Sequence, residues 1–248
     1  MRLKKTLIVI PARLKSKRLP NKLIKKIHGK EIIVWVAQRI ATLKLDYIVA
    51  IDDMIIGNLL KKYNIPFMFT NQMHLSGTSR VSEVAMKLPQ YDFYCCVQGD
   101  EPLINPQEVL GFIGIGKKMN VGYINAVCNF CEIEDPNDIA NVKALISEDG
   151  RLLRVSRHPI NINEIFMEKK IFQICGLYLF SKTFLINYKN LLPSKLEIEE
   201  GIEQLRCLEA GIKVQTLEIK GKMLSVDTQE DLKKISKIKK KDFTFAMN

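Results

Sequence analysis

The sequence has no long apolar run and contains only three histidines and one tryptophan among its 248 residues. A membrane-spanning helix needs about 18 or more apolar residues in succession, and no segment approaches that length. The apolar run at residues 7–10 ends at a proline and is too short for the apolar region of a signal peptide. We therefore expect a cytoplasmic protein without stable membrane insertion. The three histidines are too scattered to indicate a histidine metal site.

Cysteine is also scarce. The six cysteines are too few and too irregularly spaced for a disulfide framework in a chain of this length, which indicates a reducing compartment. Cys128 and Cys131 form a CxxC pattern, but no second Cys or His pair stands at zinc spacing. We interpret both as packing residues.

The chain lacks the GxxxxGK[ST] and GxGxxG patterns that bind phosphate through the backbone. Its formal charge of +11 and pI near 9.3 nevertheless favour an anionic partner. The lysines are scattered rather than concentrated with aromatic residues on one element, so we expect no nucleic-acid partner. Any phosphate that binds must be held mostly by side chains.

Apolar runs of strand length alternate with amphipathic segments along the whole chain. This alternation predicts βαβ units and a mostly parallel sheet in an α/β domain that covers residues 1–248. The middle of the chain, about 121–180, is richer in strands, so we expect an antiparallel extension or a smaller lobe there. The predicted strands are 5–10, 47–51, 66–70, 93–97, 121–128, 142–147, 171–179 and 213–219. The predicted helices are 31–43, 53–63, 77–88, 106–117, 180–191, 196–211 and 228–238.

The first predicted strand leads into a cationic loop that contains Arg13, Arg18 and Lys22. Ligands of open α/β sheets bind beyond the carboxyl ends of the strands, so these cations stand where a polyanion would bind. A solvated basic loop is the alternative interpretation.

Two carboxylates are further candidates for this ligand-binding edge of the sheet. Asp100 follows the predicted strand 93–97, and Asp227 precedes the last predicted helix. Mg²⁺ binds one or two carboxylates together with phosphate oxygens and water, so Asp100 opposite the cationic loop fits a metal that bridges protein and nucleotide. Asp227 could be a second metal ligand or a helix cap, and Asp100 could be a turn residue.

The segment His74-Leu75-Ser76-Gly77-Thr78-Ser79-Arg80 opens the predicted helix 77–88. Its hydroxyls and backbone N–H groups could contact a base or a phosphate. Capping alone would also explain Ser76 and Thr78, and His74 by itself is equally consistent with a structural role.

Several motifs occur together in an order and spacing that resemble one family. They are IPARLKSKRLPNK, HLSGTSR, VQGDEPLI, VSR, GLY, LEIEEGIEQLRCLEAG and VDTQEDL. Over essentially its whole length the chain resembles the CMP-Kdo synthetases, the 3-deoxy-manno-octulosonate cytidylyltransferases. The resemblance implies a Rossmann-like nucleotidyltransferase fold with a mixed, mostly parallel sheet and a sheet-rich lobe at about 121–195 that forms a homodimer. It also implies that CTP and a 2-keto-3-deoxy sugar acid give a CMP-sugar and pyrophosphate, for lipopolysaccharide or capsule synthesis.

The resemblance further assigns roles to individual residues. The implied catalytic residues are Arg13, Lys22, Asp100 and Asp227, of which the two aspartates would bind Mg²⁺. The implied nucleotide-binding residues are Pro11, Ala12, Arg13, Arg18, Lys22, His74, Ser76 and Gly77. The implied sugar-binding residues are Gln98, Arg157, Tyr178, Glu200 and Gln204.

The chain departs from the family pattern mainly on the sugar side. His158-Pro159-Ile160-Asn161 replaces a run that ends in Ile-Pro and an aromatic residue, and Ile174 replaces a polar histidine. A lost hydrogen-bond donor changes which sugar groups can be satisfied. The acceptor is therefore open between Kdo, an 8-amino analogue and a nine-carbon nonulosonate such as a sialic-acid-like sugar. A noncatalytic sugar-nucleotide-binding relative is the alternative to an enzyme. Smaller departures, which a phosphate loop should tolerate, are Lys17, Asn21, Leu23 and Ser79.

Overall fold

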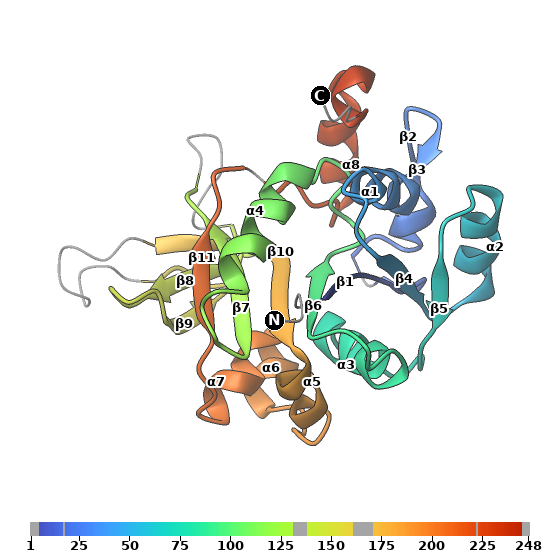
Figure 1. Cartoon of the computed structure of the whole chain (residues 1–248). Helices are drawn as coiled ribbons and strands as arrows, with labels where there is room; N and C mark the ends of the chain where they lie inside the picture. Colours follow the sequence, from blue (N-terminus) through green and yellow to red (C-terminus); the bar gives the residue numbers. More distant parts are fainter. Residues whose placement is uncertain (1–4, 17, 131–137, 161–170, 222, 245–248) are drawn as a thin grey trace.

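The structure is a computed structural model that describes residues 5–16, 18–130, 138–160, 171–221 and 223–244. Its centre is a mixed sheet with the strand order β11-β7-β10-β6-β1-β4-β5, to which β8 and β9 are attached through β10 (Figure 1). These strands are β1 (Thr6–Ala12), β4 (Tyr47–Ile51), β5 (Phe67–Phe69), β6 (Phe93–Val97), β7 (Tyr123–Cys128), β8 (Lys143–Ile146), β9 (Leu152–Ser156), β10 (Ile171–Ser181) and β11 (Gln215–Glu218).

Strands β1, β4, β5 and β6 run parallel to one another, as βαβ units require. Strand β11 is parallel to β7, whereas β10 runs antiparallel between β6 and β7. Strands β8 and β9 extend the sheet by antiparallel pairing with β10 and with each other. The predicted α/β class with a mixed sheet is confirmed.

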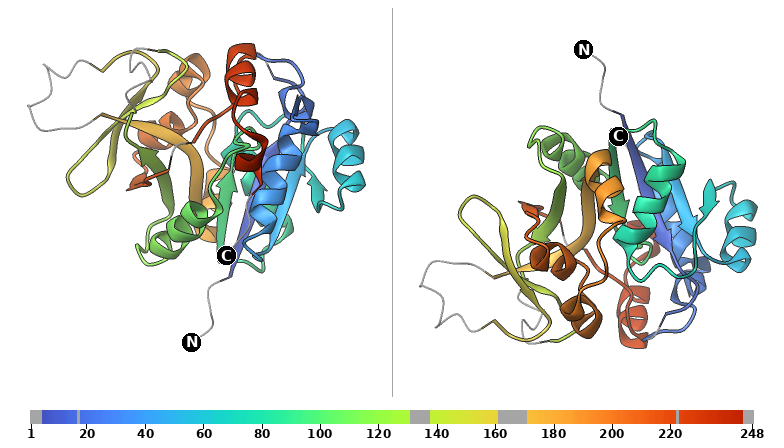
Figure 2. Two further views of the ribbon diagram at one scale, coloured as in Figure 1. Left: turned by 90° about the horizontal axis from the view of Figure 1, so that it is seen from above. Right: turned by 90° about the horizontal axis from the view of Figure 1, so that it is seen from below.

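Helices cover both faces of the sheet (Figures 1 and 2). Alternate residues of β1 point to opposite sides, so that Ile8 and Ile10 belong to one apolar cluster and Leu7 and Val9 to the other. The first cluster is completed by α1 (Ile32–Ala41), α2 (Met54–Lys62), α4 (Pro106–Gly116) and α8 (Gln229–Ser236). The second is completed by α3 (Gly77–Lys87), α5 (Lys182–Tyr188) and α7 (Gln204–Glu209).

Each predicted strand has a counterpart within a few residues, but the continuous helix predicted over 196–211 is wrong. Two short helices, α6 (Lys195–Glu200) and α7, occupy that segment. Gly201 ends α6 with a left-handed backbone, φ 65°, which glycine adopts at little cost. Sequence periodicity also missed β9 and a small hairpin of β2 (Lys26–Ile27) and β3 (Lys30–Glu31).

The five cysteines in the described part of the chain are buried and form no disulfide bond with one another. The burial of Cys128 agrees with its interpretation as a packing residue. Cys131, Lys17 and Asn161 lie outside the described residues.

Candidate active site

The segments after β1 and β6 meet because these two strands are neighbours in the sheet. The 3-10 helix η1 (Lys22–Ile24) begins at Lys22, whose Nζ donates hydrogen bonds to Asp100 Oδ2 and, at 2.9 Å, to Asp227 Oδ1. The Arg18 guanidinium lies 2.9 Å from the same oxygen of Asp227. The backbone N–H of Val226 donates to the carbonyl of Asp100 at 2.9 Å. The structure thus brings together four of the predicted site residues.

Lys22 and Asp227 are largely shielded from solvent, and each stabilises the charged form of the other. Burial alone would lower the pKa of Lys22, but Asp100 and Asp227 outweigh it and raise that pKa. Burial alone would raise the pKa of Asp227, but Lys22 and Arg18 outweigh it and lower that pKa. Lys22 and Asp227 are therefore both ionised at neutral pH.

A third carboxyl group, that of Glu101, lies behind this pair and was not predicted. It is 4% exposed, and its Oε2 has no hydrogen-bond partner among the described residues. Burial, followed by the charges of Asp100 and Asp227, raises its pKa well above the ordinary value. A buried carboxyl group whose Oε2 has no hydrogen-bond partner among the described residues therefore stands beside the two partly buried metal-ligand candidates.

Asp100 and Asp227 fit the chemistry of a magnesium site. In the described ranges no group of three or more His, Cys, Asp or Glu side chains surrounds a common point, so an all-protein metal cage is not present there. Mg²⁺ rarely needs one, because it binds one or two carboxylates and completes its shell with substrate phosphates and water. Asp100 and Asp227, which both contact Lys22, are the two carboxylates that such a site would use.

Gln98 lies between two glycines that come from opposite sides of the site. A Cβ atom on Gly77 would lie 2.9 Å from Gln98 Nε2, and one on Gly176 would lie 2.8 Å from Gln98 Cγ. The same Cβ on Gly77 would lie 3.6 Å from Pro11 Cγ. The start of α3 and the middle of β10 can therefore approach Gln98 closely only because both positions lack a side chain.

Tyr178 and Gln204 form a buried layer under Gln98. Gln98 and Gln204 lie close enough to the Tyr178 hydroxyl to counteract part of the rise in its pKa that burial causes. Gln204 Nε2 donates to Asn125 Oδ1 at 2.6 Å. Tyr178 is 6% exposed and Gln204 is 2% exposed. In this structure both therefore support Gln98 from the interior.

Arg157 is held at the other side of the ion pairs by backbone carbonyls. Its Nε donates to the carbonyl of Glu200 at 2.9 Å, and its Nη1 donates to that of Ile139 at 3.1 Å. Burial and the charge of Arg18 lower its pKa, whereas Asp227 raises it. These couplings place the Arg157 guanidinium near Arg18 and Asp227, while Glu200 contributes a backbone contact.

The first turn of α3 is already capped by protein groups. Ser76 Oγ accepts the N–H of Ser79 at 3.2 Å, and Glu203 Oε2 accepts the N–H of Thr78 at 2.8 Å. Glu203 was not predicted, and burial raises its pKa. Because these two N–H groups are occupied, the helix start has less capacity to bind a phosphate than its sequence indicates.

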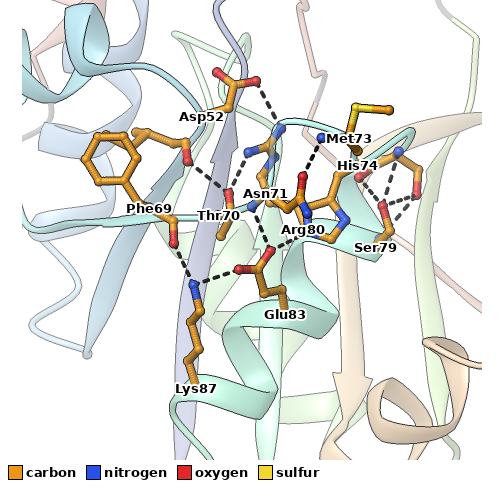
Figure 3. A network of polar contacts seen from close by, with 12 residues as sticks. Asp52, Phe69, Thr70, Asn71, Met73, His74, Ser79, Arg80, Glu83 and Lys87 are labelled. Atoms are coloured by element: carbon orange, nitrogen blue, oxygen red, sulfur yellow. Dashed lines mark hydrogen bonds and ion pairs between the residues drawn. The ribbon is translucent and has the colours of Figure 1, made fainter.

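His74 is held by a carboxylate in the second turn of α3 (Figure 3). Its Nε2 lies 2.5 Å from Glu83 Oε2, and Lys87 Nζ lies 2.6 Å from Glu83 Oε1. The N–H of Asn71 also donates to Glu83, at 2.8 Å. Burial would raise the pKa of Glu83, but the hydrogen bonds from Lys87, Asn71 and His74 outweigh it and lower that pKa to about 2. Glu83 is thus ionised and orients the imidazole.

With this geometry established, comparison with known proteins identifies the family. The profile of the family described as Cytidylyltransferase matches residues 7–219. The chain belongs to the cytidylyltransferase family. A 3-deoxy-manno-octulosonate cytidylyltransferase of Fusobacterium nucleatum subsp. nucleatum is 35% identical to this cytidylyltransferase over 236 residues, 93% of this chain and 95% of that one. Its counterpart from Acidobacterium capsulatum is 34% identical, with 93% and 94% covered.

Solved structures agree with this assignment. The structure of a CMP:2-keto-3-deoxy-manno-octonic acid synthetase complexed with CTP matches this cytidylyltransferase with a TM-score of 0.84 and 31% identity, over 94% of this chain and 98% of that one. A 4-diphosphocytidyl-2C-methyl-D-erythritol synthase from Anaerococcus prevotii matches with a TM-score of 0.62 at 15% identity, over 94% and 97%, and shares the fold. The resemblance to the CMP-Kdo synthetases that the motifs indicated is confirmed. In the described part of the cytidylyltransferase, no helix is long and apolar enough to cross a membrane.

Further residues behind the site escaped sequence analysis although part of the signal was present. Asp52 and Thr70 stand at the carboxyl ends of the predicted strands 47–51 and 66–70, where the rule applied to Arg13 and Asp100 would have selected them. Glu101 follows Asp100 in the same segment and was overlooked there. Glu203 carried no such signal, because an acidic side chain on a helix ordinarily faces solvent.

Proposed function

We propose that the protein activates 3-deoxy-manno-octulosonate (Kdo) with CTP and Mg²⁺, giving CMP-Kdo and pyrophosphate. The observation that carries this proposal is the convergence of Lys22, Asp100, Asp227 and Arg18 at the carboxyl ends of parallel strands. Relatives that carry the name 3-deoxy-manno-octulosonate cytidylyltransferase over nearly the whole chain support Kdo as the acceptor.

In the proposed reaction the anomeric hydroxyl oxygen of the sugar attacks the α-phosphorus of CTP. A new phosphorus–oxygen bond forms, the bond from the α-phosphorus to the bridging oxygen breaks, and pyrophosphate leaves with the electron pair. The hydroxyl proton is released to solvent. Such a transfer needs positioning and charge neutralisation more than covalent chemistry by the protein.

Cationic side chains suit the triphosphate. Arg13 and Arg18 are exposed in the loop after β1 and would bind phosphate oxygens, while Lys22 keeps the two carboxylates in place. Asp100 and Asp227 would hold Mg²⁺, which when bound neutralises charge that develops on the phosphates. The nucleoside would lie against the end of β1 and the start of α3, at Pro11, Ala12, His74, Ser76 and Gly77.

The sugar acid would bind on the β10 side of Gln98. Arg157 stands near Arg18 and supplies a second positive charge that suits the carboxylate of the sugar. Gln98 would contact sugar hydroxyls, with Tyr178 and Gln204 fixing its orientation from the interior and Glu200 fixing Arg157.

We also propose a homodimer formed through the lobe at about 121–195, and action in the cytoplasm, where CTP is available. Exposed apolar side chains in that lobe support an interface, among them Ile139 at 63% and Leu192 at 85% exposure. Light scattering during size-exclusion chromatography would test this point, since a monomeric mass at micromolar concentration would contradict it.

The experiment that tests the activity is pyrophosphate release from CTP and Mg²⁺ with Kdo, 8-amino-Kdo and several nonulosonic acids in parallel. We expect release with Kdo, and release that disappears with EDTA. Release with another acid alone would reassign the sugar, and CTP binding without any release would support a noncatalytic relative.

A further inference from the structure

A buried ion pair lies behind the loop that carries Arg13. Asp52 directly follows β4, and Arg80 is on the first turn of α3 (Figure 3). Arg80 Nη2 lies 3.1 Å from Asp52 Oδ2, and the two side chains are 3% and 10% exposed. Such pairs contribute little net stability compared with apolar residues of similar volume, so this one calls for a role besides stabilising the fold.

Hydrogen bonds connect this pair to three strand ends. Asp52 Oδ1 accepts the backbone N–H of Leu14 at 2.9 Å, just after β1. Arg80 Nη1 donates to Thr70 Oγ1 at 2.5 Å, and that hydroxyl donates to the carbonyl of Ile51 at 2.9 Å. The carboxyl ends of β1, β4 and β5 and the first turn of α3 are thus joined by one polar network.

The network holds the backbone of Leu14, the residue after Arg13, through a hydrogen bond. The bond from Asp52 fixes the backbone at Leu14, immediately after Arg13, while the Arg13 side chain itself is exposed. Burial lowers the pKa of Arg80, Asp52 raises it, and the nearby charge of Arg13 lowers it further. Asp52 therefore anchors the loop and also offsets the repulsion between the two guanidinium groups.

We propose that Asp52, supported by Arg80 and Thr70, is a positioning residue that orders the loop after β1 so that Arg13 faces the nucleotide phosphates before CTP binds. The inference rests on the proposed function for the identity of the nucleotide. A pre-ordered loop avoids the entropy cost of fixing the loop during binding, so the network should act mainly on CTP affinity and little on the sugar.

Electrostatics and positioning predict opposite effects of Asp52→Ala on the affinity for CTP, so one measurement distinguishes them. The substitution removes a negative charge close to a polyanion site, so charge alone predicts tighter CTP binding. Loss of the anchor at Leu14 predicts weaker binding. Asp52→Asn keeps an oxygen that can accept the Leu14 N–H. Asp53→Asn is the control at the neighbouring position, where the side chain caps α2 by accepting the N–H of Ile55.

The experiment measures the dissociation constant of CTP with Mg²⁺ by calorimetry without sugar, and the Michaelis constants of CTP and Kdo separately. We expect Asp52→Ala to weaken CTP binding by about tenfold or more with the Michaelis constant of Kdo within about twofold. Asp52→Asn should restore binding to within about threefold of wild type, and Asp53→Asn should leave it unchanged. Unchanged or tighter CTP binding by a folded Asp52→Ala variant overturns the proposal. It is also overturned if Asp52→Asn binds CTP as weakly as Asp52→Ala does.

A measurement on the wild-type protein keeps the proposal falsifiable if Asp52→Ala does not fold. Without nucleotide, the Leu14 amide should exchange with solvent about a hundredfold more slowly than the amide of its exposed neighbour Lys15. Equal exchange rates would overturn the anchor. Absence of pyrophosphate release by a wild-type protein that binds CTP would refute the proposed Kdo activity and leave the role of Asp52 standing.

Discussion

Lys22→Met tests whether one ammonium group holds the two carboxylates of the site together. Methionine keeps most of the aliphatic volume but leaves Asp100 and Asp227 to repel each other beside the buried Glu101. Removing one partner costs about 3–5 kcal/mol for a buried ion pair and about 0–1 kcal/mol for an exposed one. The side chains concerned are between 14% and 22% exposed, so we expect a loss of about 2 kcal/mol in the free energy of unfolding.

For a domain of this size, a loss of about 2 kcal/mol lowers the melting temperature by about 4–8 °C. The assay is thermal unfolding followed by circular dichroism, in EDTA and in about 10 mM Mg²⁺. Because Mg²⁺ can replace the missing positive charge between the carboxylates, it should restore part of the loss in the variant and change the wild type less. Lys26→Met is the matched control, since Lys26 is 61% exposed and its ion pair with Glu31 is 3.6 Å long. A Lys22→Met variant that melts within about 1 °C of wild type and is insensitive to Mg²⁺ would refute the reasoning.

Three further predictions concern activity and stability. Asp100→Ala should lower turnover by about a thousandfold, because a metal ion at developing charge contributes several kcal/mol, and a folded variant with near-normal turnover would contradict the metal assignment. Glu83→Gln should lower stability at neutral pH by about 2–3 kcal/mol, because the folded pKa of Glu83 is lowered to about 2. That contribution is present above the ordinary glutamate pKa and is lost as the pH falls toward about 2, so the urea midpoints of variant and wild type should converge on acidification. Glu197→Ala should lower the free energy of unfolding by about 3–5 kcal/mol, because it leaves the buried Arg206 guanidinium without the carboxylate that it contacts at 2.6 and 2.8 Å. Glu199→Ala, at an exposed position, is the control, and equal urea midpoints for the two variants would contradict this expectation.

Elements dominated by local periodicity could be predicted from the sequence. The apolar runs of β1 and β6 are buried on both faces and were placed within two residues, because a fully buried strand is apolar at nearly every position. Strand β9 escaped because Leu153 and Arg154 are both exposed and interrupt the alternation that marks a half-buried strand. The helix break at Gly201 escaped because the apolar spacing continues across it, while the backbone turns there into the left-handed region.

For the candidate site, too, local features could be predicted from the sequence and long-range contacts could not. Residues that lie within three positions of a strand end, such as Arg13 and Asp100, could be selected from the sequence, because the carboxyl ends of parallel strands meet at one edge of the sheet. Which of the selected residues pair with one another could not be predicted, because Lys22 stands 78 positions from Asp100 and 205 positions from Asp227 in the chain. A local sequence pattern contains no information about which charged residues pair when they are far apart in the chain.

The sequence by itself determined the alternation of strands and helices, the cationic loop after the first strand and, through its motifs, the family. Only the tertiary structure decided that Lys22 joins two carboxylates, that Gln98 is enclosed by two glycines, and that Asp52 anchors the loop beside Arg13. The physical reason is that periodicity and strand ends are properties of neighbouring residues, whereas the burial and pairing of charges depend on which segments the folded sheet brings together.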